Sequence, residues 1–549
     1  MSISMEEPQS VPAETARVAR AAFPKGNVYM WMRDEVGILY SDATFASLFA
    51  QVGQPALAPW RLALILVMQF LEGLSDRQAA EMVRGRIDWK YALSLELTDP
   101  GFDASVLCEF RARLVEGEAE QQILDQLLER FKAKGWLKGQ GRQRTDATNV
   151  LAAIRWVSRL VCVGETMRYT LNRLAVDAPD WLRFHLAPEW KERYGHRLDE
   201  GRLPKSKPER ESLAAVIGQD GFRLLAAAYA EETPADVRQH PAVEVLRQVW
   251  VQQYYGPVEP VQWRSQEDLP PAALMINSPY DVEARCGAKR GTGWLGYKVH
   301  LTEICDPQEP HMITNVETTN ATVNDCRLPA QIHAHLAERG LLPREHFLDA
   351  GYMEAELIVS SRKTYALDLI GPVSPDPSWQ AKAGEGFDLA CFTVDWEQQR
   401  VTCPQGNRSI KWDQTHDAHD NPIINVTFSA PICRACPQHA RCTTSVGARH
   451  ITIRPQDQHE ELQAARQRQK TSEFQAKYAL RAGIEGTFTQ AIRVTDLRRS
   501  RYIGQAKTHL QHLLSAAALN FRRIFAWFSG EPVAKTRIAP FLALFPAPC

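Results

Sequence analysis

The sequence predicts a multidomain protein in which a mixed α/β core is combined with helical segments. Three observations lead to this prediction. The 549 residues, 44% of them hydrophobic, suffice for about three or four well-filled domains of ~150 residues each. Apolar side chains recur at helical spacings of three and four in the N-terminal third of the chain and again after residue 456. From about residue 293 the period changes to that of short β-strands separated by turn residues.

The N-terminal part is predicted to be an all-α domain over residues 26–138, preceded by a disordered leader over 1–25. Ser75 and Gln78 have the spacing of a helix capping box, and a second helix start follows at Asp103. Two short helices in this order are a candidate DNA-binding helix-turn-helix. A small helical bundle without a DNA role explains the pattern equally well, because no base-reading residue stands out.

The core is predicted to be interrupted twice. Four short β-type runs and one helix define it: 296–302, 312–316, 344–348 and 365–370, with the helix at 327–339. Helical periodicity and prolines mark an insertion, and strand-like alternation marks a second one. The predicted segments are 139–160, 276–385 and 448–530 for the core, 161–275 for the helical insertion, 386–447 for the β-rich insertion and 531–549 for a C-terminal tail.

Overall charge says nothing about a nucleic-acid partner, since 64 basic and 65 acidic residues leave a net charge of −1. The N-terminus lacks the apolar segment of a signal peptide, and the longest apolar run, 62–71, is too short to span a bilayer. We therefore expect a cytoplasmic protein without a membrane partner.

Charge is unbalanced locally. Residues 491–530 contain seven Lys or Arg but a single acidic residue, Asp496. Such a stretch is a candidate track for DNA phosphates, and a solvated basic helix is the alternative. The basic residues are Arg493, Arg498, Arg499, Arg501, Lys507, Arg522 and Arg523.

Four of the eleven cysteines lie within about forty positions of one another, at Cys403, Cys433, Cys436 and Cys442. Four thiolates at these spacings can hold one structural Zn²⁺ in a tetrahedral site. Reduced structural thiols and an iron–sulfur cluster are the alternatives, and His439 or His450 could replace one sulfur. The other cysteines are scattered, as expected for small buried residues.

Three acidic residues are candidates for metal-dependent chemistry. Asp146 follows a glycine-rich turn and precedes a helical run expected from Val150, so taken alone it is most simply a helix cap. Asp349 follows an apolar strand, where it is either a turn residue or a carboxylate at the strand's end. Glu485 shares one helical face with Tyr478 and Arg481, which is also the arrangement of a solvated ion pair.

Together these segments resemble the insertion-sequence transposases of the DDE type. Residues 144–148 (Arg-Thr-Asp-Ala-Thr) resemble the strand that carries the family's first Asp, and residues 346–352 (His-Phe-Leu-Asp-Ala-Gly-Tyr) resemble the second. Tyr478, Arg481 and Glu485 match the family's signature of Tyr, two residues, Arg, three residues and Glu. Residues 278–285, followed by 296–300, also resemble the stretch before the second Asp, and the resemblance extends over about residues 30–528.

The resemblance implies a ribonuclease-H-like core, that is, a mixed sheet flanked by helices. Asp146, Asp349 and Glu485 would hold two Mg²⁺ or Mn²⁺ ions for cleavage at the ends of an insertion sequence and strand transfer into target DNA. The implied partners are the terminal inverted repeats, target DNA and a second copy of the chain on paired ends, with the protein at the nucleoid. The candidate DNA contacts are Lys298, Tyr478, Arg481, Arg493, Arg498, Arg499 and Arg501. The cysteine cluster would belong to an insertion between the second Asp and the Glu.

The chain departs from the family pattern at three positions. Ala147 stands where Ser is frequent, Asn149 where His is frequent, and Ile492 where the family has Lys, with Arg493 one place further on. The three carboxylates are unaffected. Two other hypotheses stay open at this stage: a metal-dependent nuclease of the same fold that cuts without joining, and a domesticated or decayed DNA-binding relative that does not catalyse.

Overall fold

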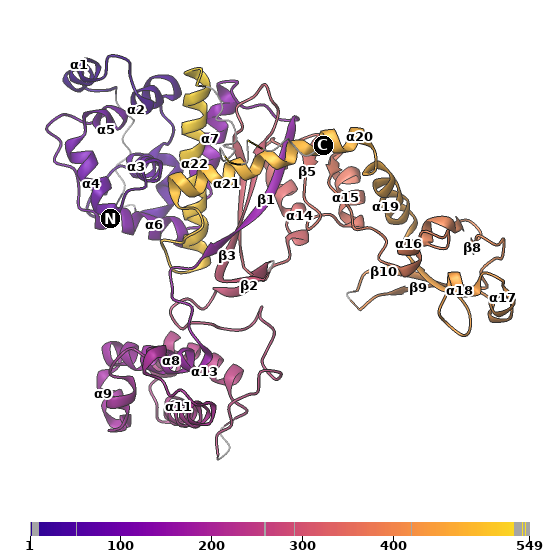
Figure 1. Cartoon of the computed structure of the whole chain (residues 1–549). Helices are drawn as coiled ribbons and strands as arrows, with labels where there is room; N and C mark the ends of the chain where they lie inside the picture. The colour runs from indigo at the N-terminus through magenta and orange to yellow at the C-terminus, as the bar shows by residue number, and fades with distance from the viewer. Residues whose placement is uncertain are drawn as a thin grey trace.

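The computed structural model describes residues 2, 10–50, 52–256, 260–289, 291–418, 420–531, 541 and 544. These residues form an N-terminal helical domain, an α/β core, a helical insertion and a small β-rich part at the far end (Figure 1). Most of the predicted C-terminal tail lies outside the described residues.

The N-terminal domain is built around a helix that is buried on nearly all sides, α3 (Pro59–Glu72). The helices around it are α1 (Ala13–Ala22), α2 (Val28–Trp31), α4 (Asp76–Gly85), α5 (Ile87–Ala92), α6 (Ser105–Glu116) and α7 (Gln122–Ala133), with a π-helical turn at Met32–Val36 and a 3₁₀ turn at Asp42–Leu48. The predicted capping box is confirmed: the Ser75 hydroxyl accepts from the Gln78 amide, and the Gln78 side chain accepts from the Ser75 amide.

The start of the chain differs from the expected disordered leader. Residues Ala13–Ala22 form α1, which buries Ala19 against Met30 and Tyr91. This small apolar cluster gives the helix a partner, and tertiary packing rather than helix propensity accounts for most helical stability in proteins. Residues 1 and 3–9 of the expected leader lie outside the described residues.

The core contains a mixed sheet whose strand order is β2-β3-β1-β5-β6, with β4 also paired to β3. Strand β3 runs antiparallel to β1, β2 and β4, whereas β5 runs parallel to both β1 and β6. The strands are β1 (Arg142–Leu151), β2 (Arg285–Lys289), β3 (Thr292–Ile304), β4 (Ile313–Asn320), β5 (Glu345–Phe347) and β6 (Asp368–Ile370). The mixed α/β core and the helical N-terminal domain predicted from the sequence are therefore present.

One local prediction in the core is wrong. No helix begins at Val150: β1 continues to Leu151, and the next helix, α8 (Arg159–Asp177), starts at Arg159. The reason is tertiary, because β1 is a central strand whose backbone pairs with β3 along its whole length. Such pairing overrides the helical preference of a Leu-Ala-Ala sequence. Asp146 is thus a strand residue and not a helix cap.

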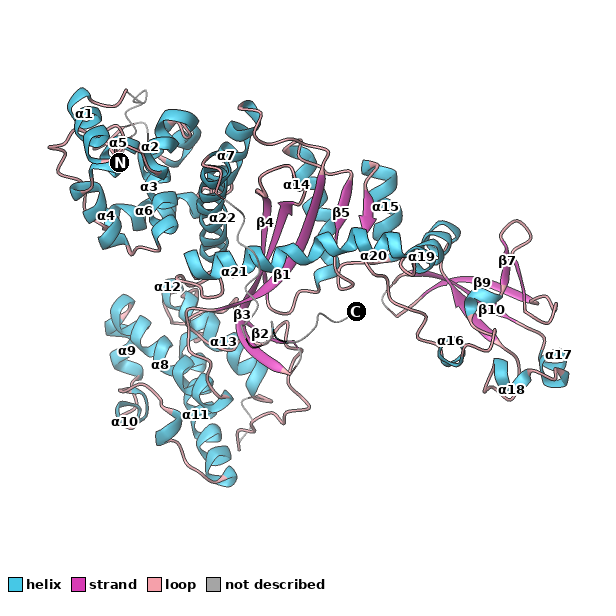
Figure 2. Ribbon diagram, turned by 45° about the horizontal axis from the view of Figure 1, so that its top comes forward, coloured by secondary structure: helices cyan, strands magenta, loops and turns pink. Residues whose placement is uncertain are grey.

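Helices cover the sheet and join it to the N-terminal domain. They are α14 (Pro329–Glu338), α15 (Ala355–Tyr365), α19 (Gln456–Arg468), α20 (Ser472–Tyr478), α21 (Ile484–Thr495) and α22 (Gln505–Phe528). The long helix α22 contacts α3, α7 and β4, and Figure 2 shows it close to α7 at one side of the sheet. Its Asn520 side chain donates to and accepts from the backbone of Ile313, which pins the helix to β4. One continuous hydrophobic core results.

The helical insertion leaves the core after β1 and returns before β2. It comprises α8, α9 (Pro179–His185), α10 (Trp190–Tyr194), α11 (Lys207–Ala228), α12 (Ala235–Arg238) and α13 (Pro241–Gln253), with a 3₁₀ turn at Glu200–Arg202. A separate hydrophobic cluster that includes Trp190, Trp250 and Tyr254 holds these helices together. Figure 1 shows this bundle set apart below the sheet. None of the described helices combines the length and apolarity that crossing a membrane requires.

The β-rich part consists of two small sheets and short helices. Its elements are α16 (Trp379–Ala383), a 3₁₀ turn (Leu389–Cys391), β7 (Thr393–Asp395), β8 (Arg400–Thr402), β9 (Lys411–His416), β10 (Pro422–Thr427), α17 (Ala430–Ala435), α18 (His439–Cys442) and β11 (His450–Ile453). Because β11 pairs with β10, the part extends to Ile453, beyond the predicted limit of 447.

Candidate functional site

One face of β1 holds the C-terminal segment that carries Glu485. Side chains alternate along a strand, so Arg144, Asp146 and Thr148 project from the same face. Arg144 donates to the carbonyl of Leu480, Asp146 pairs with Arg481, and Thr148 accepts from Nε of Arg498 at 2.8 Å. Three successive same-face residues of one strand thus contact the chain between residues 480 and 498.

Asp349 lies two residues after the end of β5, the strand next to β1. Strand β1 pairs with β5 in parallel, with Arg144 opposite Phe347. Two residues beyond that pair stand Asp146 and Asp349, so the register brings both carboxylates to the same level of the sheet. The Asp349 carboxylate accepts from the amide of Gly351 at 2.8 Å, which orients it.

Arg481 connects the two aspartates. Its guanidinium donates to the Asp146 carboxylate and lies 3.6 Å from the Asp349 carboxylate. It comes from the 3₁₀ turn Ala479–Gly483, which separates α20 from α21. The continuous helical face expected for Tyr478, Arg481 and Glu485 is therefore broken, and this turn directs Arg481 toward the sheet.

Glu485 lies in the first turn of α21, and its side chain is exposed. Its charge acts on Asp146. The pKa of the Asp146 carboxyl is raised to about 6 mainly because the side chain is buried; Arg481 opposes the rise, while Asp349 and Glu485 add to it. Burial and repulsion by two other carboxylates destabilise the ionised form of a carboxyl group unless a positive charge compensates them. Asp349 and Glu485 thus lie close enough to Asp146 to raise its pKa, although the described residues contain no three His, Cys, Asp or Glu side chains already arranged as a metal site.

Tyr478 packs into a small apolar cluster next to the aspartates. Its ring stacks on Phe474 with a centroid distance of 5.6 Å, and it contacts a cluster that includes Cys305, Phe347 and Ile370. Burial raises the pKa of its hydroxyl. The side chain is partly exposed, so its use as a DNA contact remains a prediction.

Of the predicted DNA-contacting cations, some are exposed and others are bound to groups within the protein. Arg493, Arg498 and Arg499 are exposed, and Arg498 also donates to Thr148. Arg501 instead lies over the ring of Phe70 at 4.7 Å and donates to the carbonyl of Leu74, which joins the core to the N-terminal domain. The remaining candidate, Lys298, pairs with Asp325 at 2.8 Å and is largely buried. Of these five cations, the three exposed arginines have side-chain surface available for phosphate contacts.

The neighbouring core contains buried neutral histidines whose effect on stability can be tested. Burial lowers the pKa of His300 and His333 to about 4 and that of His512 to about 3. An unfolded histidine binds a proton near pH 6.5, so below that pH protonation favours unfolding. Stability is complete above pH 6.5 and decreases as the pH falls toward 4. At pH 5 each histidine costs about 2 kcal/mol, and Asp146 offsets about 1 kcal/mol in the opposite direction.

We therefore expect the free energy of unfolding, measured with urea, to be several kcal/mol lower at pH 5.0 than at pH 7.5. The substitution His512→Gln should reduce this difference by about a third, whereas His196→Gln, at an exposed position, should leave it unchanged. Equal stability at both pH values would contradict the prediction.

The four clustered cysteines line one pocket in the β-rich part, together with His439. The other three thiols contribute to the raised pKa of Cys442, although burial is the larger cause. His439 Nε2 is buried there with no hydrogen-bond partner among the described residues. His450 lies outside this lining and bonds to Thr427. Within the described residues, no group of three or more His, Cys, Asp or Glu side chains is already arranged as a metal site.

Two models of known protein families match parts of the chain. A family model described as "Transposase domain (DUF772)" matches residues 18–113, and one described as "Transposase DDE domain" matches residues 402–525. Both matches support an insertion-sequence transposase of the DDE type. The first match covers most of the N-terminal helical domain, and the second contains Glu485 and most of the β-rich part. No curated protein and no solved structure matches the transposase.

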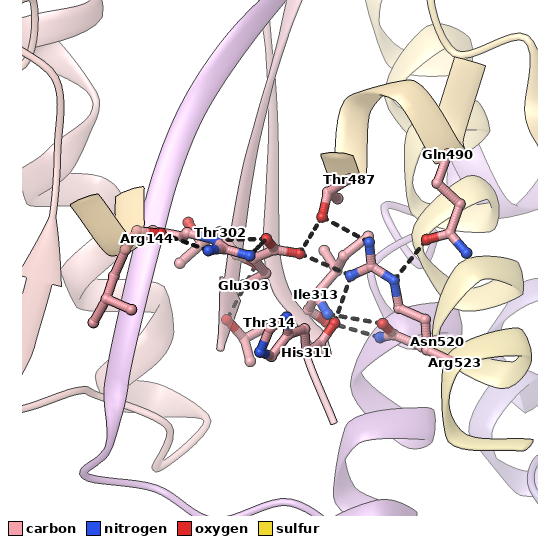
Figure 3. Close-up of polar contacts among 11 residues, drawn as sticks. Arg144, Thr302, Glu303, His311, Ile313, Thr314, Thr487, Gln490, Asn520 and Arg523 are labelled. Carbon is pink, nitrogen blue, oxygen red and sulfur yellow. Dashed lines mark hydrogen bonds and ion pairs between the residues drawn. The ribbon is translucent and has the colours of Figure 1, made fainter. Parts of the chain in front are cut away.

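Sequence reasoning missed one buried charge next to the site of the transposase. Glu303 on β3 is completely buried between Arg144 and Arg523 (Figure 3). The sequence contained a signal for this buried charge. An acidic residue in the run Val-His-Leu-Thr-Glu-Ile needs cationic partners if that strand is buried. Arg523, counted above in the basic stretch, is one of these partners and faces the core.

Proposed function

We propose that this transposase cleaves DNA at insertion-sequence ends and joins the ends to target DNA, using Asp146, Asp349 and Glu485. The observation that carries the proposal is the register of β1 and β5, which sets the two aspartates side by side within reach of Arg481. The strand order, with antiparallel strands continued by two parallel ones, supports a ribonuclease-H-like core. The domain boundaries proposed from the sequence apply, except that α1 belongs to the N-terminal helical domain and the β-rich part extends to Ile453.

The donor set fits divalent metal ions. Carboxylate oxygens are the ligands that Mg²⁺ and Mn²⁺ prefer. The pKa of Asp146 is raised mainly by burial, with smaller contributions from Asp349 and Glu485, and a bound cation would favour its ionised form. Asp146, Asp349 and Glu485 would hold the ions. When bound, two such ions supply stabilisation of the attacking and leaving oxygens in phosphodiester cleavage.

Arg481 has two possible partners in this proposal. Without metal, its guanidinium compensates Asp146 and Asp349. A guanidinium can also donate two parallel hydrogen bonds to a phosphate, so Arg481 can orient the DNA strand next to the carboxylates. The exposed Arg493, Arg498 and Arg499 would extend the phosphate contacts beyond the site.

The deciding experiment incubates the purified protein with labelled duplexes that carry the element's terminal repeats and a supercoiled target plasmid, in Mg²⁺ or Mn²⁺. We expect cleaved 3′ ends that become joined to the plasmid. Cleavage without joining would favour the nuclease alternative, and binding without cleavage in either metal would favour the non-catalytic relative. Light scattering of the end complex should show two copies of the chain on paired ends.

The exposed arginines should determine the salt dependence of DNA binding. Each phosphate contact contributes about −0.9 to the slope of log K against log salt concentration. Arg493→Ala with Arg499→Ala should therefore reduce the magnitude of this slope by about 1.8, equally for specific and random duplexes. Arg183→Ala, an exposed arginine of the helical insertion, is the matched control. An unchanged slope in the double variant would remove these arginines from the DNA contact.

We also propose that the cysteine cluster holds one structural Zn²⁺. Four thiols around one pocket form a donor set that Zn²⁺ prefers, and the unpartnered His439 nitrogen provides an alternative to one sulfur. The residues that would hold the ion are Cys403, Cys433, Cys436 and Cys442. Its role would be to stabilise the β-rich part and not to take part in DNA cleavage.

A further inference from the structure

Glu303 is a fully buried carboxylate with three donors. Arg144 contributes two nitrogens to Oε1 at 2.6 and 2.7 Å, whereas Arg523 and Thr487 donate to Oε2 at 2.7 and 2.6 Å (Figure 3). Burial alone would favour the neutral acid, yet the two arginines keep the pKa of Glu303 below its usual value. The carboxylate is therefore ionised and saturated with hydrogen bonds, an arrangement that fixes its partners strongly.

The partners of Glu303 lie on both sides of the site residues along the chain. Thr487 is two residues after Glu485 on α21. Arg144 is two residues before Asp146 on β1, and its guanidinium also donates to the carbonyl of Leu480, immediately before Arg481. One buried acid thus contacts, directly or through Arg144, the beginning and the end of the segment that carries Arg481 and Glu485.

The turn between Arg481 and Glu485 is fitted closely to this network. A Cβ atom at Gly483 would lie 2.1 Å from the Arg144 guanidinium, so a larger residue cannot occupy this position without displacing it. Arg523 reinforces the other end, since it donates to the Thr487 hydroxyl at 2.7 Å and to Gln490 at 2.9 Å. Both ends of the segment are consequently held by hydrogen bonds with defined directions.

Apolar packing alone would not define this position as narrowly. Ile484, Phe488 and Ala491 bury the inner face of α21. These contacts hold the helix against the sheet, but apolar burial has no preferred direction and tolerates small sliding movements. The hydrogen bonds of the charged network have defined directions, so they restrict the sliding of α21 that the apolar contacts would allow.

We propose that Glu303 is a positioning residue, which sets Arg481 and Glu485 opposite Asp146 by holding the segment 480–487 through Arg144 and Thr487. This inference rests on the proposed function. Glu303 itself lies inside the core and does not contact DNA or metal. Its loss should leave the DNA-binding surface intact while it loosens the third carboxylate.

The test uses Thr487→Val, which keeps the shape of the side chain and removes its hydroxyl, together with Glu303→Gln. Three quantities are measured on the full chain: amide hydrogen exchange over 479–487 without metal, Mn²⁺ affinity by electron paramagnetic resonance, and the kcat and KM of end cleavage. In both variants we expect about tenfold faster exchange in that segment, about tenfold weaker Mn²⁺ binding and a lower kcat at unchanged KM for DNA. Thr487→Ser, which retains the hydroxyl, should restore all three.

Glu317→Gln is the matched control, because Glu317 is a buried carboxylate on β4 that pairs with His335 and does not contact the segment. It should leave exchange over 479–487 and Mn²⁺ affinity at parental values. Parental exchange and Mn²⁺ affinity in Thr487→Val would overturn the proposal. Faster exchange throughout β1 and β3 would also overturn it in favour of a general stabilising role. If the parent protein neither binds Mn²⁺ nor cleaves DNA, the proposed function is wrong. The exchange measurement, which needs no metal, still tests whether Glu303 holds the segment 480–487.

Discussion

Asp146→Asn should reduce end cleavage by about 10³-fold or more while the protein becomes more stable. The loss follows because a metal-holding carboxylate supplies several kcal/mol of transition-state stabilisation, and each 1.36 kcal/mol corresponds to a factor of ten. The gain follows because an ionised carboxyl whose pKa is raised to about 6 opposes folding at neutral pH. An amide of the same shape removes this penalty, about 3 kcal/mol for a rise of two units from 3.8.

The two readouts are the rate of strand cleavage in Mg²⁺ and the free energy of unfolding in urea at pH 7.5. Asp496→Asn is the matched control, because Asp496 is exposed at the end of the helix that carries Glu485. Its backbone lies in the left-handed region, with φ of 53°, which Asn also tolerates. The control should keep parental activity and stability. A variant Asp146→Asn that retained cleavage, or that lost several kcal/mol of stability, would show that Asp146 has a structural role instead.

The expected loss of cleavage and gain in stability of Asp146→Asn together would distinguish a ligand-binding role of Asp146 from a structural one. A residue selected for folding alone would not keep a buried carboxylate close to two others. Asp146 is nevertheless held next to Asp349 and near Glu485, with Arg481 as its compensating charge. A site that is strained without its ligand is what a cation-binding function requires, because the same repulsion favours binding of positive charge.

The local environments of the three candidate acids could be predicted only in part from the sequence. Asp349 could be placed at a strand's end because the apolar run before it is short and is followed by glycine. The strand around Asp146 was harder to predict, because both of its faces are largely buried. Its sequence therefore lacks the alternation of apolar and polar residues that marks a strand with one face in solvent. Only the partner strands β3 and β5 distinguish such a strand from a helix start, and they come from distant parts of the chain.

The sequence also could not show which long cationic side chains face solvent and which face the core. Arg493 and Arg523 belong to the same basic stretch, but the first is exposed and the second binds Glu303 in the core. Their difference depends on which face of each helix meets the sheet. Lys298 was likewise assigned to DNA from its place in a motif, while the structure pairs it with Asp325. Local charge counts therefore overestimate the surface available for phosphate.

The β-rich part should unfold when its proposed zinc site is destroyed. Its hydrophobic cluster contains seven buried residues, among them Phe392, Val401 and Phe428. A core of this size does not stabilise a separate unit of about 70 residues, and small units of this kind are usually stabilised by disulfides or metal. All described cysteines are free, so in our proposal the zinc site would supply the cross-link. Structural zinc supplies about 10 kcal/mol or more to such folds, so its loss leaves them unfolded.

Cys436→Ser should reduce the zinc content, measured by inductively coupled plasma mass spectrometry, from one ion per chain to none. Limited proteolysis should then cut within residues 386–453, while the sheet that contains β1 and β3 stays protected. Cys391→Ser is the matched control, since Cys391 is exposed in the same part and bonds to Asp388. His439→Gln tests whether the unpartnered nitrogen serves as a ligand, in which case zinc affinity decreases. A parent protein without zinc would contradict the site, and visible absorbance from bound iron would replace it with the iron–sulfur alternative.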